Sequence, residues 1–197
     1  MLQLVNSIPK TIKEIAVKFQ DTGFEVSLVG GTVRGIIMEF SIADWDMPTN
    51  ATPEEIQKLF PHSFYDNKFG TVGIPTKDVG VVEVTTYRTE GQYKDNRRPS
   101  SVSWGTSLEE DLKRRDFTIN AMALKFEENN VTLIDPFQGQ NDLKSQLIKA
   151  VGDPNERFNE DSLRLLRAIR IATQLDFDIE NKTLDAISKN AGLIANV

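Results

Sequence analysis

The chain has 197 residues, of which 39% are hydrophobic and 26% are charged, a composition typical of a folded globular protein and too apolar for a disordered one. A formal net charge of −6 argues against a protein whose whole surface binds nucleic acid. The sequence has no cysteine, which excludes disulfides, thiolate metal sites and thiol nucleophiles. No apolar run reaches the roughly 18 residues that a membrane span requires, so we expect a cytoplasmic protein without a membrane segment.

The first third of the chain alternates helical and strand patterns. Apolar residues between Ile8 and Phe19 recur at helical spacing, and Gly23 is expected to end that helix. A strand is predicted next, followed by a glycine pair, a short helix and a second strand, over residues 24–29, 30–31, 32–39 and 42–47. Thr52, Pro53 and Glu55 combine an N-cap, a first-turn proline and a capping-box glutamate, which predicts a helix to about Phe60.

The remainder changes from mixed patterns to helical ones. Strands are predicted over residues 71–75, 79–87 and 131–134, helices from the Ser107–Glu110 capping box and over 118–124, and a long polar loop over 89–103. From Gln138 onward the strand patterns stop, and helices are predicted over 138–146, 160–174 and 181–190. We therefore expect an α+β domain over residues 1–140 and a helical segment over 141–197. The chain stops abruptly after Val197, and we expect it to be truncated.

Asp44-Trp45-Asp46 is the first group of residues that points to chemistry. Alternate residues on a strand face the same side, so both carboxylates would project together and repel each other unless a cation neutralises them. Mg²⁺ favours one or two carboxylates completed by substrate phosphates. Taken alone, such a pair is more often a solvated strand end or a turn.

Gly30 and Gly31 separate a predicted strand from a predicted helix that contains Arg34. Glycines at this place let backbone amides approach a phosphate closely, and Arg34 would add a charged donor. The simpler alternative is an ordinary strand-to-helix turn. The order of glycine turn, arginine and then carboxylate pair favours an arrangement that presents a nucleoside triphosphate to a metal.

Glu83 interrupts an otherwise apolar strand pattern. If Val82 and Val84 face the core, Glu83 faces the other side, either beside the aspartates as a third ligand or helper, or as a plain exposed strand residue. The sequence leaves both interpretations open.

Arg114-Arg115-Asp116 and Asn120 stand between two predicted helices. Their charges could simply complement helix dipoles. The functional interpretation places Arg115 on a triphosphate, with Asp116 and Asn120 bracing the loop.

The segment from Glu160 to Arg170 places charges along one stripe of a predicted helix. A solvated face with an Asp161–Arg164 pair is the simpler interpretation. The alternative is that Asp161 and Arg164, one acceptor and one donor, pair with the edge of a nucleobase, while Arg167 and Arg170 hold phosphate or an RNA end.

Seven motifs in order resemble the class II tRNA nucleotidyltransferase and poly(A) polymerase family, and the resemblance runs from about Gly23 to the end of the chain. The motifs that carry it are Leu28-Val29-Gly30-Gly31-Thr32-Val33-Arg34, Asp44-Trp45-Asp46, Glu83-Val84-Thr85-Thr86-Tyr87-Arg88, Asp95-Asn96-Arg97-Arg98-Pro99, Leu112-Lys113-Arg114-Arg115-Asp116-Phe117-Thr118-Ile119-Asn120-Ala121, Ile134-Asp135-Pro136-Phe137 and the segment from Glu160 to Arg170.

The resemblance implies a DNA-polymerase-beta-like nucleotidyltransferase head with a mixed or antiparallel sheet, followed by a helical neck. It implies addition of C and A to a tRNA 3′ end from CTP and ATP, by metal-assisted attack of the 3′-hydroxyl on the α-phosphate. The implied roles are Mg²⁺ binding by Asp44 and Asp46; triphosphate contact by Gly31, Arg34 and Arg115; base reading by Asp161 and Arg164; and completion of the nucleotide pocket by Arg167 and Arg170.

The segment from Asp95 to Pro99 resembles the flexible loop that the family uses when it switches from C to A addition. Two positions depart from the family pattern, because Gly35 stands where aspartate is usual and Trp45 where an aliphatic residue is usual. A poly(A) polymerase or A-adding enzyme, and a non-catalytic nucleotide- or RNA-binding relic, stay as alternatives. A C-terminal RNA-binding region or a second polypeptide is expected to supply the missing part.

Overall fold

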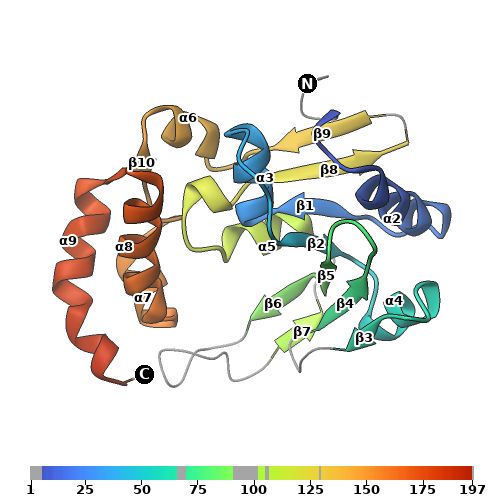
Figure 1. Cartoon of the computed structure of the whole chain (residues 1–197). Coiled ribbons are helices and arrows are strands. Elements are labelled where there is room, and N and C mark those ends of the chain that lie inside the picture. The colour runs from blue at the N-terminus through green and yellow to red at the C-terminus, as the bar shows by residue number, and fades with distance from the viewer. Residues whose placement is uncertain (1–5, 66–69, 91–101, 105–106, 129, 197) are drawn as a thin grey trace. The chain divides into compact units, whose positions relative to one another are not determined.

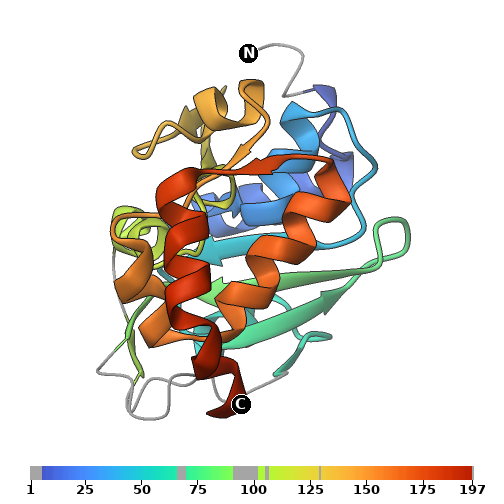
Figure 2. The ribbon, with the colours of Figure 1, turned by 90° about the vertical axis from the view of Figure 1, so that its left-hand side faces the viewer.

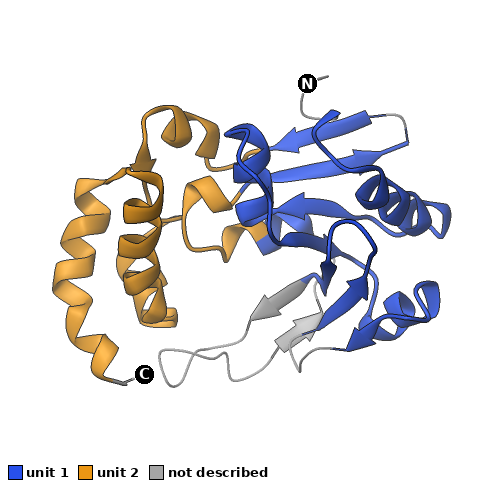
Figure 3. Ribbon diagram, in the orientation of Figure 1, with its two compact units in different colours: residues 1–88, 104–111, 122–134 blue, residues 89–103, 112–121, 135–197 orange. Residues whose placement is uncertain are grey.

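The computed structural model describes residues 6–65, 70–90, 102–104, 107–128 and 130–196. The chain forms two compact units, shown in blue and orange in Figure 3. Unit 1 comprises residues 1–88, 104–111 and 122–134, and unit 2 comprises residues 89–103, 112–121 and 135–197. The residue ranges of these units differ from the predicted domain 1–140 and helical segment 141–197. The prediction that those two segments form a catalytic head and a neck stays a prediction.

Unit 1 contains a three-stranded antiparallel sheet in the order β1 (Ser27–Val29), β8 (Ala123–Glu127), β9 (Asn130–Ile134). Figure 1 shows these strands side by side, and α2 (Lys10–Asp21) and α3 (Gly30–Ile37) belong to the same unit (Figure 3). The amphipathic helix α2 buries Ile12, Ile15, Ala16 and Phe19, the residues whose spacing predicted it.

A second sheet of unit 1 has the strand order β2 (Trp45–Thr49), β5 (Val81–Thr86), β4 (Thr71–Pro75), β3 (Phe64–Tyr65). Strands β2 and β5 are parallel, and the other neighbours are antiparallel. The helix α4 (Pro53–Leu59) begins with the predicted capping box, in which the Thr52 side chain accepts from the Glu55 amide and the Glu55 carboxylate accepts from the Thr52 amide.

Unit 2 is mostly helical. Its elements are η1 (Thr118–Asn120), α6 (Gly139–Lys144), β10 (Leu147–Ile148), α7 (Pro154–Glu160), α8 (Leu163–Leu175), β11 (Asp178–Ile179), α9 (Asn181–Asn190) and η2 (Ala191–Asn196). Helix α7 packs against both α8 and α9, and Figure 2 shows α8 and α9 facing the viewer. The boundary between the units runs through α5 (Leu108–Lys113) and through the strand pair β6 (Arg88–Glu90) and β7 (Val102–Trp104).

Four sequence expectations are corrected by the structure. Residues 118–124 are not a helix, because only a 3-10 turn forms before β8, which lies centrally between β1 and β9 and pairs with both. Strands do not stop at Gln138, since β10 and β11 pair in parallel. The predicted helix 160–174 is broken at Asp161, whose backbone is extended. The predicted loop 89–103 has strand pairing at both ends, while its centre and the Asp95–Pro99 motif lie outside the described residues.

Three predicted strands are shorter than expected, including β5, which spans Val81–Thr86 instead of residues 79–87. The first begins at Ser27 and the second at Trp45, and α3 starts at Gly30, two residues earlier than predicted. In the part of the chain that the structure describes, no helix is long and apolar enough to span a membrane.

Candidate nucleotidyl-transfer site

The predicted glycine pair forms the turn from β1 into α3. Gly30 has φ of 65°, in the left-handed region that favours glycine. Val29 at the N-cap provides no side-chain hydrogen bond to the first turn of α3. A Cβ at the exposed Gly31 would lie 3.6 Å from Arg34 Nη2, so the guanidinium of Arg34 lies beside this glycine. The backbone of the glycine pair and the guanidinium of Arg34 therefore lie together at the start of α3.

Thr32 connects this helix start to the aspartate pair. Its hydroxyl donates to the carbonyl oxygen of Asp44 at 2.9 Å and accepts from the amide of Asp46 at 3.2 Å. The Thr32 side chain is buried, with 1% of the residue exposed. Sequence reasoning missed this role because the pattern placed Thr32 only at the start of a helix. One buried hydroxyl thus fixes the backbone on both sides of Trp45.

The two aspartates lie where β2 begins. Asp44 precedes the strand and is exposed, Asp46 is half-buried within it, and Trp45 between them is buried at 4% exposure. Trp45 therefore packs into the core, as alternation predicted. Among the described residues no group of three His, Cys, Asp or Glu side chains is placed to hold a metal. An accessible carboxylate pair nevertheless fits Mg²⁺, which commonly completes its shell with substrate phosphates and water.

Glu83 lies on the strand next to Asp46. The parallel register pairs Asp46 directly with Glu83, so both side chains leave the same face of the sheet. Glu83 is exposed while Val82 and Val84 are fully buried, the alternation that the sequence predicted. A role for Glu83 as third ligand or helper stays a prediction.

In unit 2, Asp116 is the centre of a buried network. Its Oδ2 accepts from Nε and Nη2 of Arg167 at 2.8 and 2.6 Å, and its Oδ1 accepts from the Phe117 amide at 2.8 Å and Asn120 Nδ2 at 3.1 Å. Burial alone would raise the pKa of Asp116, but the charge and hydrogen bonds of Arg167, with those of Asn120 and Phe117, hold this pKa below its ordinary value. Asp116 therefore stays ionised and fixes the loop after Arg115.

Arg164 is fixed by three acceptors, two of them in α7 and one in the segment after α5. Its Nη1 donates to Glu160 Oε2 at 2.7 Å and to the carbonyl oxygen of Arg157 at 3.3 Å, and its Nη2 donates to the carbonyl oxygen of Arg114 at 3.0 Å. Only 7% of the residue is exposed. Glu160 also pairs with Arg157. The sequence identified Arg164 but not the carbonyl oxygens that orient it.

The other predicted residues of unit 2 are Arg115, which follows α5, and three residues on α8 and at its start. Asp161 is half-buried, and its Oδ1 accepts from the Leu163 amide at 3.0 Å, beginning the new helix. Arg115 is half-buried, Arg167 is 46% exposed at its side chain, and Arg170 is exposed. The described contacts thus join Asp116, Asn120 and Arg167 directly, whereas Arg164 is connected to this loop through Arg114.

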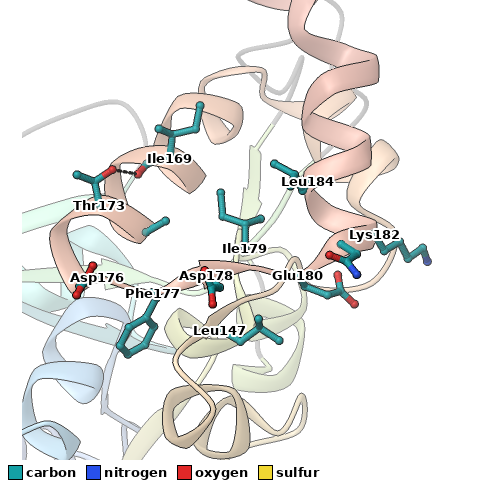
Figure 4. Close-up of a pocket in the computed structure, with 12 residues that line it drawn as sticks. Leu147, Ile169, Thr173, Asp176, Phe177, Asp178, Ile179, Glu180, Lys182 and Leu184 are labelled. Carbon is teal, nitrogen blue, oxygen red and sulfur yellow. Dashed lines mark hydrogen bonds between the residues drawn. The ribbon is translucent and has the colours of Figure 1, made fainter.

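A pocket elsewhere in unit 2 contains none of the predicted site residues. It lies between α8, β11 and the start of α9, and Figure 4 shows Ile169, Phe177, Ile179 and Leu184 among the side chains that line it. This pocket therefore does not identify the candidate site.

The α+β architecture of unit 1 and the carboxylate pair at the start of β2 define the class of nucleotidyltransferase heads. Residues 26–149 match the family described as the poly A polymerase head domain, and the chain belongs to this family.

Curated relatives and solved structures agree with this assignment. The CCA-adding enzyme of Ligilactobacillus salivarius is 44% identical, with 98% of this chain and 48% of that enzyme covered. For the CCA-adding enzyme of Enterococcus faecalis the identity is 46%, with the same two coverages. The crystal structure of the Bacillus stearothermophilus CCA-adding enzyme in complex with CTP superposes with a TM-score of 0.84 at 36% identity, covering 96% of this chain and 46% of that one. The chain spans about half the length of these relatives.

Proposed function

We propose that this chain is the catalytic head of a CCA-adding enzyme, which transfers C and A from CTP and ATP to the 3′ end of tRNA. The observation that carries the proposal is the accessible Asp44–Asp46 pair, fixed by Thr32 to the helix start that contains Gly31 and Arg34. The similarity to CCA-adding enzymes, including structures in complex with CTP, with ATP and with tRNA, supports this choice of substrates.

In this mechanism Asp44 and Asp46 would hold Mg²⁺, which, when bound, would lower the pKa of the 3′-hydroxyl for attack on the α-phosphate and would stabilise the pyrophosphate that leaves. Gly30 and Gly31 let the backbone of α3 approach the triphosphate, and Arg34 and Arg115 neutralise its charge. Asp116 and Asn120 fix the backbone that carries Arg115. Asp161 and Arg164 provide an acceptor and a donor for the edge of the incoming base, and Arg167 and Arg170 complete the nucleotide pocket.

The test is incubation with Mg²⁺, labelled CTP and ATP, and a tRNA that lacks its 3′ CCA. Ordered addition of two C residues and one A is the expected result, whereas a long A tail would assign the chain to poly(A) polymerases. Asp44→Ala should abolish incorporation and retain the wild-type melting temperature. Asp21→Ala, an exposed aspartate at the end of α2, is the matched control and should keep full activity.

Chelation of the metal should stop incorporation by the wild-type protein, and added Mg²⁺ should restore it. Substantial activity of Asp44→Ala would contradict the assignment of the metal site. If the chain binds CTP and ATP but forms no product, it requires the further RNA-binding region or second polypeptide that is expected from its sequence. If it binds neither nucleotide, the proposed function is wrong and the chain is a non-catalytic relic.

A further inference from the structure

The registers of the four-stranded sheet place four residues in one row. Asp46 pairs with Glu83, Glu83 pairs with Gly73, and Gly73 pairs with Phe64. Directly paired residues project from the same face of a sheet. Phe64 therefore lies on the face of the catalytic carboxylates, at the opposite end of their row.

The two faces of this sheet differ in burial. On one face the central residues Trp45, Val82, Ile74, Val84 and Val72 are all less than 9% exposed. On the face of the carboxylates, Glu83 is exposed, Val81 is 44% exposed and Phe64 is 46% exposed, whereas Pro48, Thr71 and Gly73 are buried. An aromatic ring thus lies on the partly exposed face of the sheet, in the same row as Asp46.

The ring of Phe64 extends across the neighbouring strand. A Cβ placed on Gly73 would lie 2.5 Å from Cζ of Phe64 and 2.8 Å from its Cε2, so the far end of the ring covers the glycine. Because strands are spaced by about 4.8 Å, the covered position is about 10 Å from the Asp46 backbone. This span is comparable with the length of one nucleotide.

Covering a glycine near a sheet edge is itself stabilising, and an aromatic residue can serve only that purpose. Covering Gly73 does not by itself require the ring of Phe64 to be half exposed, or to lie in the same row as Asp46. We propose that Phe64 is the stacking platform for the terminal base of the RNA acceptor, whose 3′-hydroxyl is held at the aspartate pair. The proposal rests on the proposed function.

The chemistry of phenylalanine favours the acceptor base over the base of the incoming nucleotide. Its ring has no hydrogen-bond donor or acceptor, so it stacks on every base and selects none. An incoming nucleotide must be discriminated, which such a ring does not do. An acceptor end must be held whatever its last base, because that base changes with each addition.

The test measures stacking directly, through the fluorescence of 2-aminopurine at the 3′ end of a short tRNA acceptor helix. Stacking on the ring quenches this fluorescence, so titration with wild-type protein should give saturable quenching. Phe64→Leu should weaken the binding of the RNA about tenfold and lose the quenching, while Phe64→Trp should keep both. Gly73→Ala should show the same loss of quenching and of RNA affinity as Phe64→Leu, because the added methyl group displaces the ring of Phe64 without changing its chemistry.

Tyr65→Ala is the matched control. Tyr65 is the next residue, is 47% exposed, and pairs with the buried Val72 in a row of the opposite face. This variant should quench as the wild type does, and melting curves should show that all variants fold. Equal quenching by Phe64→Leu and wild type, or equal loss with Tyr65→Ala, would overturn the proposal, as would no quenching by the wild type.

The failures of the two proposals are distinguishable. If the wild type adds C and A but Phe64→Leu retains wild-type quenching and RNA affinity, the function holds and the stacking role of Phe64 is wrong. If wild type quenches through Phe64 but Asp44 is dispensable for incorporation, the stacking platform stands and the proposed metal site fails.

Discussion

The hydroxyl of Thr32 donates a 2.9 Å hydrogen bond to the carbonyl oxygen of Asp44. The same oxygen atom of Thr32 accepts from the Asp46 amide, so the helix that begins at the glycine pair and the start of β2, where the aspartates lie, are held in one arrangement. The single buried hydroxyl of Thr32 thus limits the movement of the backbone at both aspartates before substrate binds. Catalytic groups that are held in place in this way are better aligned with the reacting atoms.

Thr32→Val should therefore impair incorporation by at least about tenfold, because the carboxylates lose their fixed backbone. It should also cost about 1–3 kcal/mol of unfolding free energy, since two buried polar groups lose their partner. Thr86→Val is the control, because the Thr86 hydroxyl is equally buried and donates to the carbonyl oxygen of Ala51. It should lower stability but not activity, and Thr32→Ser should restore activity. Equal loss of activity in both valine variants would show that Thr32 acts only through stability.

Asp116→Asn should destabilise the fold at neutral pH, because Arg167 loses a buried charged partner. We expect a loss of about 1–2 kcal/mol, reduced from the buried-pair range because the Arg167 side chain is half exposed. The pKa of Asp116 is lower in the folded protein than in the unfolded chain, so its stabilisation is complete above the unfolded value of about 3.9 and is lost as pH falls through the folded pKa. Denaturant unfolding of both proteins between pH 7 and pH 3 should show the difference shrink below about pH 4. A difference that does not depend on pH would contradict this assignment.

Arg164→Lys should relax the discrimination between CTP and ATP by about tenfold, because an ammonium group cannot contact its three present acceptors with the same geometry. The measurement is the ratio of kcat/KM for the two nucleotides on acceptors that await C and A. Arg157→Lys is the matched control, since Arg157 pairs with the same Glu160 and donates to the carbonyl oxygen of Lys113. A uniform fall in both rates, with the ratio unchanged, would assign Arg164 a structural role only.

Gly35→Asp, which restores the residue usual in the family, should destabilise this chain. A Cβ on Gly35 would lie 3.2 Å from Cγ1 of Ile42, so a larger side chain must displace that neighbour at a cost of about 1–3 kcal/mol. The double variant with Ile42→Ala should recover part of the loss, and thermal unfolding of the four proteins in the cycle measures the coupling. Strict additivity would show that Ile42 is not the reason for glycine at this position.

Local sequence patterns predicted the elements whose signals are self-contained. The capping box at Thr52 and Glu55, the amphipathic spacing of α2 and the alternation around Glu83 each formed as expected, because neighbouring residues alone specify caps, helix faces and strand faces. The ordered motifs also indicated the family, which the match to the poly A polymerase head domain confirms.

Tertiary pairing decided what those local patterns did not contain. Residues 123–127 became the central strand β8 because β1 and β9 provide partners on both sides, and no local signal encodes that. The contact of Thr32 with Asp44, the bond from Arg164 to the Arg114 carbonyl oxygen and the row from Asp46 to Phe64 each join residues distant in sequence. The sequence by itself determined which side chains could perform the chemistry. Only the folded chain decided which of them meet, because register and hydrogen-bond geometry arise when separate segments pack together.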